Sequence, residues 1–223
     1  MEKAILCNCA KEPFKICDAN GKYIGCLQTY FDSNHRVICL DEKPYQLIGQ
    51  VQSPIVKSDG SILEDYEYVR NGTAQIVMCF EPLAGKRYVK VKDTNNRFDW
   101  VDTVSSLLDN EYKNVPLISL VQDNHSAHKP EAFYEAYSAK KAKQYLDRLN
   151  FEFTPAHGSW LNMAEFELSI LSRQALKRFD NKKDLIDQIY IWETERNKKI
   201  VKANWQFTKE GARVKLKNIY PSL

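Results

Sequence analysis

One short segment of the chain reads as the interior strand of a sheet. Residues Leu117–Val121 (LISLV) carry no charge and have apolar side chains on both sides of an extended strand. Such a strand is typical of a parallel sheet covered on both faces, whereas a strand with one solvated face alternates between apolar and polar residues. Helical periodicity precedes and follows it, over residues 96–110 and 131–150. The sequence therefore predicts an α/β domain with helices on both faces of a central sheet.

The part of the chain before this segment is rich in β-forming residues. Five runs predict strands: Arg36–Leu40, Tyr45–Gln52, Tyr66–Arg70, Thr73–Phe80 and Arg87–Lys92. We expect the second run to pair with the first. Asn71-Gly72 lies between the third and fourth runs and predicts a tight hairpin turn, because both residues tolerate the positive φ that such turns require. These strands are expected to be antiparallel.

The part after this segment is mainly helical. Besides residues 131–150, apolar residues recur at helical spacing over Leu161–Phe179 and Asp184–Arg196. A short strand is expected at Phe151–Thr154, and a last helix is expected after Thr208, a suitable N-cap residue. The whole order gives a mixed sheet of three antiparallel strands followed by parallel strands, with helices on both faces. The ribonuclease H-like fold has this order of elements.

The composition is that of an ordinary globular protein. The chain has 223 residues and a formal net charge of +3, a basic excess too weak to predict nucleic-acid binding by itself. It has no apolar run of about 18 residues, the length that spans a membrane. Its first residues lack the apolar core of a secretory signal. We therefore expect a cytoplasmic protein with no membrane partner.

The sequence contains six cysteines, which raises the question of a zinc site. Four of them lie near the N-terminus: Cys7, Cys9, Cys17 and Cys26. They lack the paired spacing of about two to four residues that zinc fingers and ribbons use, so we do not expect them to bind zinc. Cys39 and Cys79 lie within strand-like apolar runs and are expected to be buried packing residues.

Acidic residues follow two of the predicted strands where each apolar run ends. Asp41 follows Val37–Leu40, and Asp123 follows Leu117–Val121 after one further residue. Because open α/β sheets bind ligands at the carboxyl ends of their strands, both carboxylates are expected at one edge of the sheet. Neighbouring carboxylates repel each other, and Mg²⁺, which takes oxygen ligands, would remove that repulsion. Taken alone, each residue is also typical of a turn or of a helix cap.

A third acid is expected on the helix that begins near Leu161. Glu165 and Glu167 both lie in its first turns, and a spacing of two residues places them about 200° apart around the helix axis. They cannot both face one metal site, and apolar neighbours on both sides leave the periodicity undecided between them. Either residue is also typical of a solvated charge or of a first-turn Glu that the helix dipole favours.

Several stretches resemble the DDE transposases of the bacterial insertion-sequence 630 family, within the mariner-type superfamily. Residues 157–174 resemble the third catalytic motif of that family, Cys39–Leu47 resembles the first, and Asp123-Asn124 with His128 resembles the second. Further matching stretches are Tyr66–Tyr68, Arg70–Ala74, Glu81–Gly85, Asn204–Thr208 and Lys215–Pro221. The likeness is collinear from about residue 29 to the C-terminus. Together these motifs are highly specific.

The resemblance implies a catalytic site and a reaction. Asp41, Asp123 and Glu165 would form the metal-binding catalytic triad, with Glu165 preferred over Glu167. The expected cofactors are Mg²⁺ or Mn²⁺, bound as a pair of ions. The expected reaction is metal-dependent nicking of DNA at insertion-sequence ends, followed by attack of a 3′-hydroxyl on target DNA.

The resemblance also implies partners and supporting residues. The expected partners are the terminal inverted repeats of the mobile element and the target DNA, bound by a homodimer. Supporting roles are expected for Asn124, His128, His157 and Lys43. His128 is expected either to touch the scissile phosphate or to orient Asp123. Lys43 is expected either to contact phosphate or to be a solvated turn residue.

Residues 1–30 match the family poorly and do not resemble the helix-turn-helix domains that its full-length members carry. We therefore expect a leader over residues 1–30 and a ribonuclease H-like catalytic domain with C-terminal helices over residues 31–223. Two other functions stay open. One is another nuclease of the same fold, such as an enzyme that cuts RNA/DNA hybrids, and the other is a truncated remnant that binds DNA without cutting it.

Overall fold

The computed structural model describes residues 4–6, 14–18, 23–27, 32–52, 55–63, 67–154 and 162–203, and it describes the first three segments by their backbone alone. Those three segments are the strands β1 (Ala4–Leu6), β2 (Phe14–Asp18) and β3 (Tyr23–Leu27), which form a small antiparallel sheet. The helix expected after Thr208 lies outside the described residues, and so does His157.

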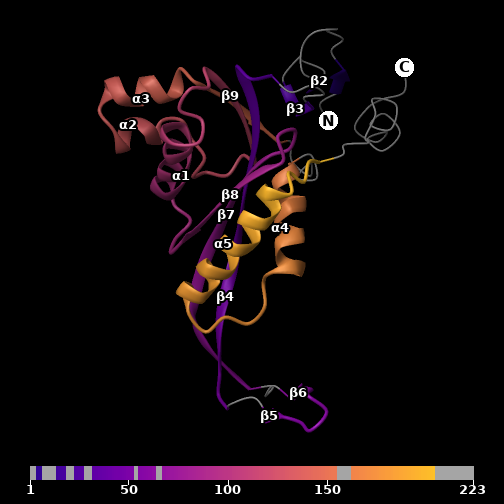
Figure 1. The fold of residues 1–223 in the computed structure, drawn as a ribbon. Helices are drawn as coiled ribbons and strands as arrows, with labels where there is room; N and C mark the ends of the chain where they lie inside the picture. The colour runs from indigo at the N-terminus through magenta and orange to yellow at the C-terminus, as the bar shows by residue number, and fades with distance from the viewer. Residues whose placement is uncertain are drawn as a thin grey trace.

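A five-stranded mixed sheet forms the centre of the molecule (Figure 1). In order across the sheet, its strands are β10 (Leu149–Phe153), β9 (Leu117–Gln122), β4 (His35–Gln50), β7 (Tyr68–Glu81) and β8 (Lys86–Lys92). β4, β7 and β8 pair in antiparallel fashion, whereas β9 is parallel to both β4 and β10. The predicted α/β arrangement of three antiparallel strands followed by parallel strands, which is ribonuclease H-like, is confirmed.

Helices cover both faces of this sheet and enclose two hydrophobic cores. One core lies beneath α1 (Arg97–Asp109), α2 (Ala132–Ala136) and α3 (Ala139–Leu146). The other lies beneath α4 (Met163–Gln174) and α5 (Lys182–Lys198). Because successive strand residues point to opposite faces, Leu40 packs in the first core and Cys39 in the second. Cys79 is also buried, so the expectation for both strand cysteines is confirmed.

Side-chain caps fix where the helices begin. Asn96 accepts hydrogen bonds from the backbone N–H groups of Phe98 and Asp99, and the Asp99 carboxylate accepts one from the N–H of Asn96. This capping box starts α1. Asn181 starts α5 by accepting a bond from the N–H of Asp184. The helices predicted over these two segments are confirmed to within about two residues at each end.

The strands expected at Arg36–Leu40 and Tyr45–Gln52 are one continuous strand, β4, so the expectation that they pair with each other is wrong. Asp41 consequently lies within a strand and not at its end. Pro44, which lacks a backbone donor, is tolerated because β9 pairs only with His35–Cys39. The outer part of β4 has a neighbour in the sheet on one side alone, which is where strands accept proline.

The hairpin turn expected at Asn71-Gly72 is also wrong, because β7 runs through these residues. The register between β7 and β4 shifts here, between Gln46 and Ile48. Gly72 has a φ of 107°, a conformation that side chains disfavour. An extra residue with glycine at positive φ is typical of a β-bulge. The same Asn-Gly signal that predicts a turn therefore produces an irregularity inside a long strand.

The single helix expected over residues 131–150 is two short helices, α2 and α3, followed by the first residues of β10. Tyr137 has an extended backbone (φ −131°, ψ 164°), which ends α2. Phe133 and Tyr145 nevertheless pack in the same core, so the apolar periodicity continues across the break. On the other face of the sheet, α4 ends at Gln174 and not at the expected Phe179.

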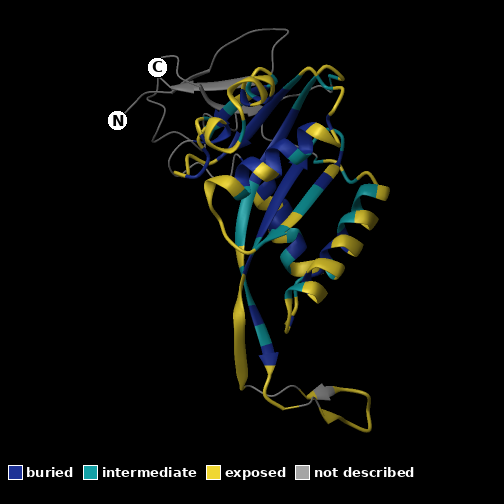
Figure 2. Ribbon diagram, turned by 90° about the vertical axis from the view of Figure 1, so that its left-hand side faces the viewer, coloured by how far each residue is buried: buried dark blue, intermediate teal, exposed yellow. Residues whose placement is uncertain are grey.

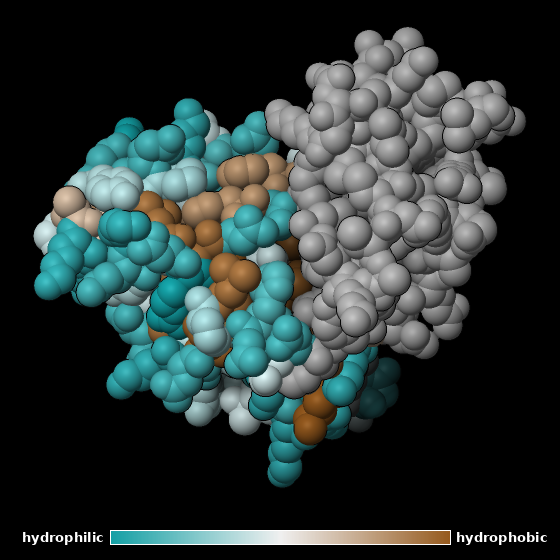
Figure 3. All heavy atoms as spheres, turned by 90° about the horizontal axis from the view of Figure 1, so that it is seen from above, coloured by the Kyte–Doolittle hydropathy of each residue, from teal (hydrophilic) through white to brown (hydrophobic). Residues whose placement is uncertain are grey.

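β4 and β7 continue beyond the sheet as a two-stranded arm, whose tip carries the short strands β5 (Ile55–Val56) and β6 (Ile62–Leu63). In Figure 2 the β7 strand of the arm is exposed, whereas the β4 strand there includes buried and intermediate residues, and the sheet between the helices is mostly buried. Figure 3 views the opposite end of the molecule, where the described surface is mostly hydrophilic. Among the described helices, none is long and apolar enough to cross a membrane.

Candidate active site

The strand register brings Asp41 and Asp123 together. β9 pairs in parallel with the first part of β4, and the last paired residues are Cys39 and Val121. Two residues further along, the same register sets Asp41 beside Asp123, the first residue after β9. Neighbouring strands lie roughly 4.8 Å apart, and residues in register point to the same face. Both acids therefore lie where β9 leaves β4, and Asp41 points to the face that α4 covers.

Asn162 attaches the start of α4 to this point. Its side-chain oxygen caps the helix by accepting a bond from the N–H of Ala164 at 3.1 Å. Its Nδ2 donates to the carbonyl oxygen of Leu40 at 2.7 Å. The first turn of α4, which carries the exposed Glu165, is thereby held against the residue that precedes Asp41. A single buried amide thus links the third acid to the first.

The surroundings of Asp41 oppose its negative charge. Burial is the main reason that the pKa of its carboxyl rises to about 6. The N–H of Glu42 lowers this pKa by donating to Asp41 Oδ1 at 2.8 Å, while the charges of Asp123, Glu165 and Glu42 raise it further. Asp123 and Glu165 therefore lie close enough to Asp41 for their charges to act on it. A bound cation would favour the ionised form of Asp41.

Asp123 is held by a buried histidine. His128 Nδ1 lies 2.8 Å from Asp123 Oδ1, and this bond is the main reason that the pKa of Asp123 is lowered. The Nε2 of His128 lies 3.3 Å from Glu42 Oε1. Burial alone would lower the pKa of His128, but the two carboxylates outweigh it and raise this pKa to about 9. The ring therefore carries a positive charge at neutral pH and donates from both nitrogens.

Glu165 and Glu167, which the periodicity could not rank, have different surroundings. Glu167 is buried and binds the guanidinium of Arg87 through two hydrogen bonds of 2.9 Å each. Arg196 donates a third bond of 2.9 Å. Burial would raise the pKa of Glu167, but the two arginines lower it overall. Glu167 therefore joins α4 to β8 and α5, and Glu165 is the acid on the outer side of α4.

The supporting residues predicted from the sequence lie in several environments. Lys43 shares a strand face with Asp41 and donates to Ser172 Oγ of α4 at 2.6 Å. Asn124 is exposed directly after Asp123. His128 is in contact with Asp123, as above. His157 lies outside the described residues.

Two residues of this site were missed by the sequence analysis, Asn162 and Glu42. Asn162 precedes an apolar helical run, which is a general N-cap signal, but the cap does not reveal its second bond to β4. Glu42 has no local signal, because its partner His128 lies 86 residues away in the sequence.

The donor chemistry of the three acids fits a divalent cation, since carboxylate oxygens are the ligands that Mg²⁺ and Mn²⁺ prefer. Within the part of the chain that the structure describes, however, no group of three or more His, Cys, Asp or Glu side chains is already arranged to hold a metal ion. The described side chains of the three acids therefore do not form a complete set of metal ligands in this structure.

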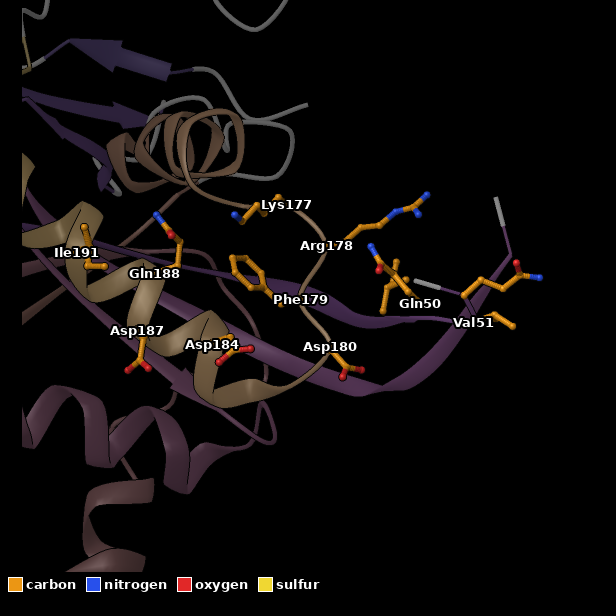
Figure 4. Close-up of a pocket in the computed structure, with 12 residues that line it drawn as sticks. Gln50, Val51, Lys177, Arg178, Phe179, Asp180, Asp184, Asp187, Gln188 and Ile191 are labelled. Atoms are coloured by element: carbon orange, nitrogen blue, oxygen red, sulfur yellow. The ribbon is translucent and has the colours of Figure 1, made fainter. Parts of the chain in front are cut away.

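A cavity of about 660 Å³ lies at the base of the arm and is separate from these acids (Figure 4). Its walls include Ile48 of β4, Lys177, Asp180 and, on α5, Asp187. Ile48 is seven residues from Asp41 along β4, roughly 23 Å at about 3.3 Å per residue. Because acidic and basic side chains line it together, the cavity does not indicate one class of ligand.

The fold is similar to solved structures of the Mos1 mariner transposase. The Mos1 strand transfer complex is 14% identical, with a TM-score of 0.49, over 75% of this chain and 52% of that chain. The Mos1 paired-end complex with Mn is 17% identical, with a TM-score of 0.47, over 74% of this chain and 50% of that chain. The catalytic domain of Mos1 is 16% identical, with a TM-score of 0.44, over 75% of this chain and 81% of that chain.

The chain spans about half the length of the first two of these proteins. No curated protein sequence matches it. The sequence profile of the DDE superfamily endonucleases matches residues 36–186, a segment that contains Asp41, Asp123 and Glu165. Because this match covers about two thirds of the residues, the chain belongs to the DDE superfamily of endonucleases.

Proposed function

We propose that the chain is the catalytic domain of a DDE transposase that nicks and joins DNA at insertion-sequence ends with Mg²⁺ or Mn²⁺. The strand register supports this proposal: β4 and β9 pair in parallel up to Cys39 and Val121, and Asp41 and Asp123 each follow two residues later. Glu165 lies in the first turn of α4. The family match includes all three acids and supports giving them the catalytic role.

Asp41, Asp123 and Glu165 would hold the divalent ions. A pair of such ions supplies a nucleophile from water or a 3′-hydroxyl and stabilises the leaving oxygen of the phosphodiester. The chain contributes position: one acid lies in β4, one directly follows the neighbouring strand β9, and the third lies on a helix that Asn162 joins to β4. Little more is required, since phosphoryl transfer depends mainly on placement and on neutralising charge.

Several basic residues of β4 and of the α4 segment are suited to contact a nucleic-acid backbone. Lys43 is held by Ser172 on the face of β4 that carries Asp41, and we assign it a phosphate contact. Arg173 and Lys177 are exposed at the end of α4 and just after it. Asn124, exposed beside Asp123, is assigned a supporting contact. His157 receives its supporting role from the family resemblance alone.

The substrate in this proposal is DNA in the bacterial cytoplasm. The terminal inverted repeats of the element and the target DNA would be bound by two copies of the chain. Each copy would supply one set of acids. These assignments follow from the family resemblance, and the exposed basic residues are consistent with them.

The test uses the purified chain and a labelled duplex that carries the inverted repeats flanking its gene. With Mg²⁺ or Mn²⁺ the chain is expected to nick at the repeat end, and Asp123→Asn is expected to slow nicking about 10³-fold, the rate equivalent of several kcal/mol. Asp147→Asn, an exposed change on the surface beyond α3, serves as the control. Equal nicking by the parent chain and Asp123→Asn would refute the mechanism, and cleavage of an RNA/DNA hybrid instead would indicate another nuclease.

A further inference from the structure

A chain of three polar side chains joins β4 to the loop after β9: Glu42 of β4, and His128 and Asp123 of the loop. His128 lies in this loop and is only 3% exposed. Its Nδ1 faces Asp123 Oδ1 at 2.8 Å, and its Nε2 faces Glu42 Oε1 at 3.3 Å. Glu42 therefore acts on Asp123 through the imidazole ring, although the two carboxylates do not bond to each other.

The surroundings of His128 exclude the role of a phosphate contact. The ring of Trp100 lies 5.8 Å from the imidazole, measured between ring centroids. Gln122 accepts a hydrogen bond from Trp100 Nε1 at 2.9 Å and donates to the carbonyl oxygen of His128 at 3.4 Å. A ring enclosed in this way, with both nitrogens directed at carboxylates, is not available to DNA.

Glu42 reaches His128 because of its place in β4. It follows Asp41, and successive strand residues point to opposite faces of a sheet. Asp41 therefore faces α4, whereas Glu42 faces the side of the sheet that carries α1 and His128. The side chain of Glu42 is only 9% exposed. β4 thus supplies Asp41, the first acid of the site. Its next residue, Glu42, contacts the histidine that bonds to Asp123, the second acid.

Asp123 needs such a restraint, because its own side chain is 55% exposed. The restraint acts on one oxygen: Oδ1 accepts the bond from His128 and a second bond of 3.2 Å from the N–H of His125. Neither bond uses Oδ2. A carboxylate held in this way has lost the rotation that would otherwise oppose metal binding.

We propose that Glu42 is a positioning residue, which acts through His128 to hold Asp123 in the orientation that binds a divalent ion. The inference deepens the proposed function and rests on it. Partners of metal ligands in other proteins typically change metal affinity about 10–100-fold when they are removed. An effect of that size is expected here.

The experiment measures Mn²⁺ binding to the purified chain without DNA, by the loss of the free-ion signal in electron paramagnetic resonance. Glu42→Met keeps the volume and removes the acceptor, and it is expected to weaken Mn²⁺ binding about 10–100-fold. Glu42→Gln keeps an oxygen that can accept from Nε2, and it is expected to bind within about threefold of the parent chain. Glu193→Gln is the matched control, since this acid of α5 accepts a bond from the N–H of Val89.

The outcomes separate this inference from the proposed function. If Asp123→Asn binds Mn²⁺ as tightly as the parent chain, the proposed metal site is wrong. If Asp123→Asn loses binding while Glu42→Met binds normally, the positioning role of Glu42 alone is wrong. Equal weakening by Glu42→Gln and Glu42→Met would also contradict it, because the retained oxygen would then make no difference.

A second measurement does not depend on the folding of any variant. In ring-¹⁵N spectra of the parent chain, the ring N–H of His128 that faces Asp123 is expected to be protected from exchange with solvent, because the ring is enclosed. The exposed His125 provides the comparison within the same spectrum. Exchange at His128 as fast as at His125 would overturn the inference.

Discussion

At the scale of single residues, Asp41 is the acid whose environment is least favourable to its charge. Burial and three neighbouring acids raise its pKa from 3.8 to about 6. The native state therefore favours the protonated form more than the unfolded state does. At a pH below 3.8, the pKa of Asp41 in the unfolded chain, the preference contributes its full stabilisation. This stabilisation is lost as the pH rises through about 6, the pKa in the folded protein. The ionised site is thus a source of instability at neutral pH when no cation is bound.

Asp41→Asn is accordingly expected to stabilise the metal-free protein at pH 7.5. Asparagine removes the charge and keeps an oxygen for the N–H of Glu42, so the gain should be about 1–2 kcal/mol, or roughly 2–8 °C in Tm. At pH 4.5, where Asp41 is mostly protonated, the gain should be much smaller. Thermal melts in a chelator at both pH values, with Asp147→Asn as control, measure the effect. A lower Tm for Asp41→Asn at pH 7.5 would contradict this explanation.

At the scale of elements, α4 separates two acids that are two positions apart in the sequence. Glu167 faces inward to Arg87 and Arg196, whereas Glu165 is exposed, and its charge raises the pKa of Asp41. One side of the helix is therefore fixed by a buried ion-pair network, and the other side presents a carboxylate to the candidate site. Losing a partner from a buried ion pair typically costs about 3–5 kcal/mol, because the remaining charge stays buried.

Exchanging these two acids for glutamine should give opposite results. Glu167→Gln is expected to lower the free energy of unfolding by about 3 kcal/mol, since Arg87 and Arg196 then lose their buried countercharge. Glu165→Gln is expected to leave the Tm nearly unchanged and to slow nicking about 10³-fold. Urea denaturation and the nicking assay, run on both variants below their melting temperatures, test the pair. A stable and inactive Glu167→Gln would reverse the assignment.

Elements with strong local signals could be predicted from the sequence. β9 has an apolar run, β8 alternates, and α1 and α5 have helical periodicity with capping residues. The errors arose where distant partners decide the outcome. β4 continues through Pro44 because β7 pairs with it along its outer half. Asn71-Gly72 forms a bulge because β4 lies opposite, and no local pattern distinguishes a bulge from a turn.

At the scale of the whole molecule, the site depends on contacts between segments far apart in the sequence. The sequence led to the pairing of Asp41 with Asp123 because both follow apolar runs that form parallel strands, although Asp41 lies within β4 and not at its carboxyl end. The bonds that refine the site could not be predicted. Glu42 meets His128 across 86 positions, and Asn162 meets Leu40 across 122 positions. Sequence patterns report which side of an element is buried, but not which polar atom on another element lies opposite.

The arm is expected to contribute little to the stability of the whole molecule. Its described residues beyond Gln50 are exposed up to Thr73, and they include Ile55 at 64% and Val56 at 68%. The described side chains that would be lost on replacing residues 51–67 with a short Gly-Ser turn are exposed, and loop-closure entropy changes only by about 0.6 kcal/mol per halving of length. Thermal melts should show a Tm shift of a few degrees at most. A collapse in Tm would show that the arm supports the cores.

The register between β4 and β9 also bears on how the protein is made. β9 pairs with a strand that left the ribosome about 80 residues earlier, and the helix with the third acid follows some 40 residues later. Pairing between such distant segments is slow to form. A nascent chain that stops before α4 carries two of the three acids, so in our proposal premature termination yields a polypeptide that cannot cut DNA.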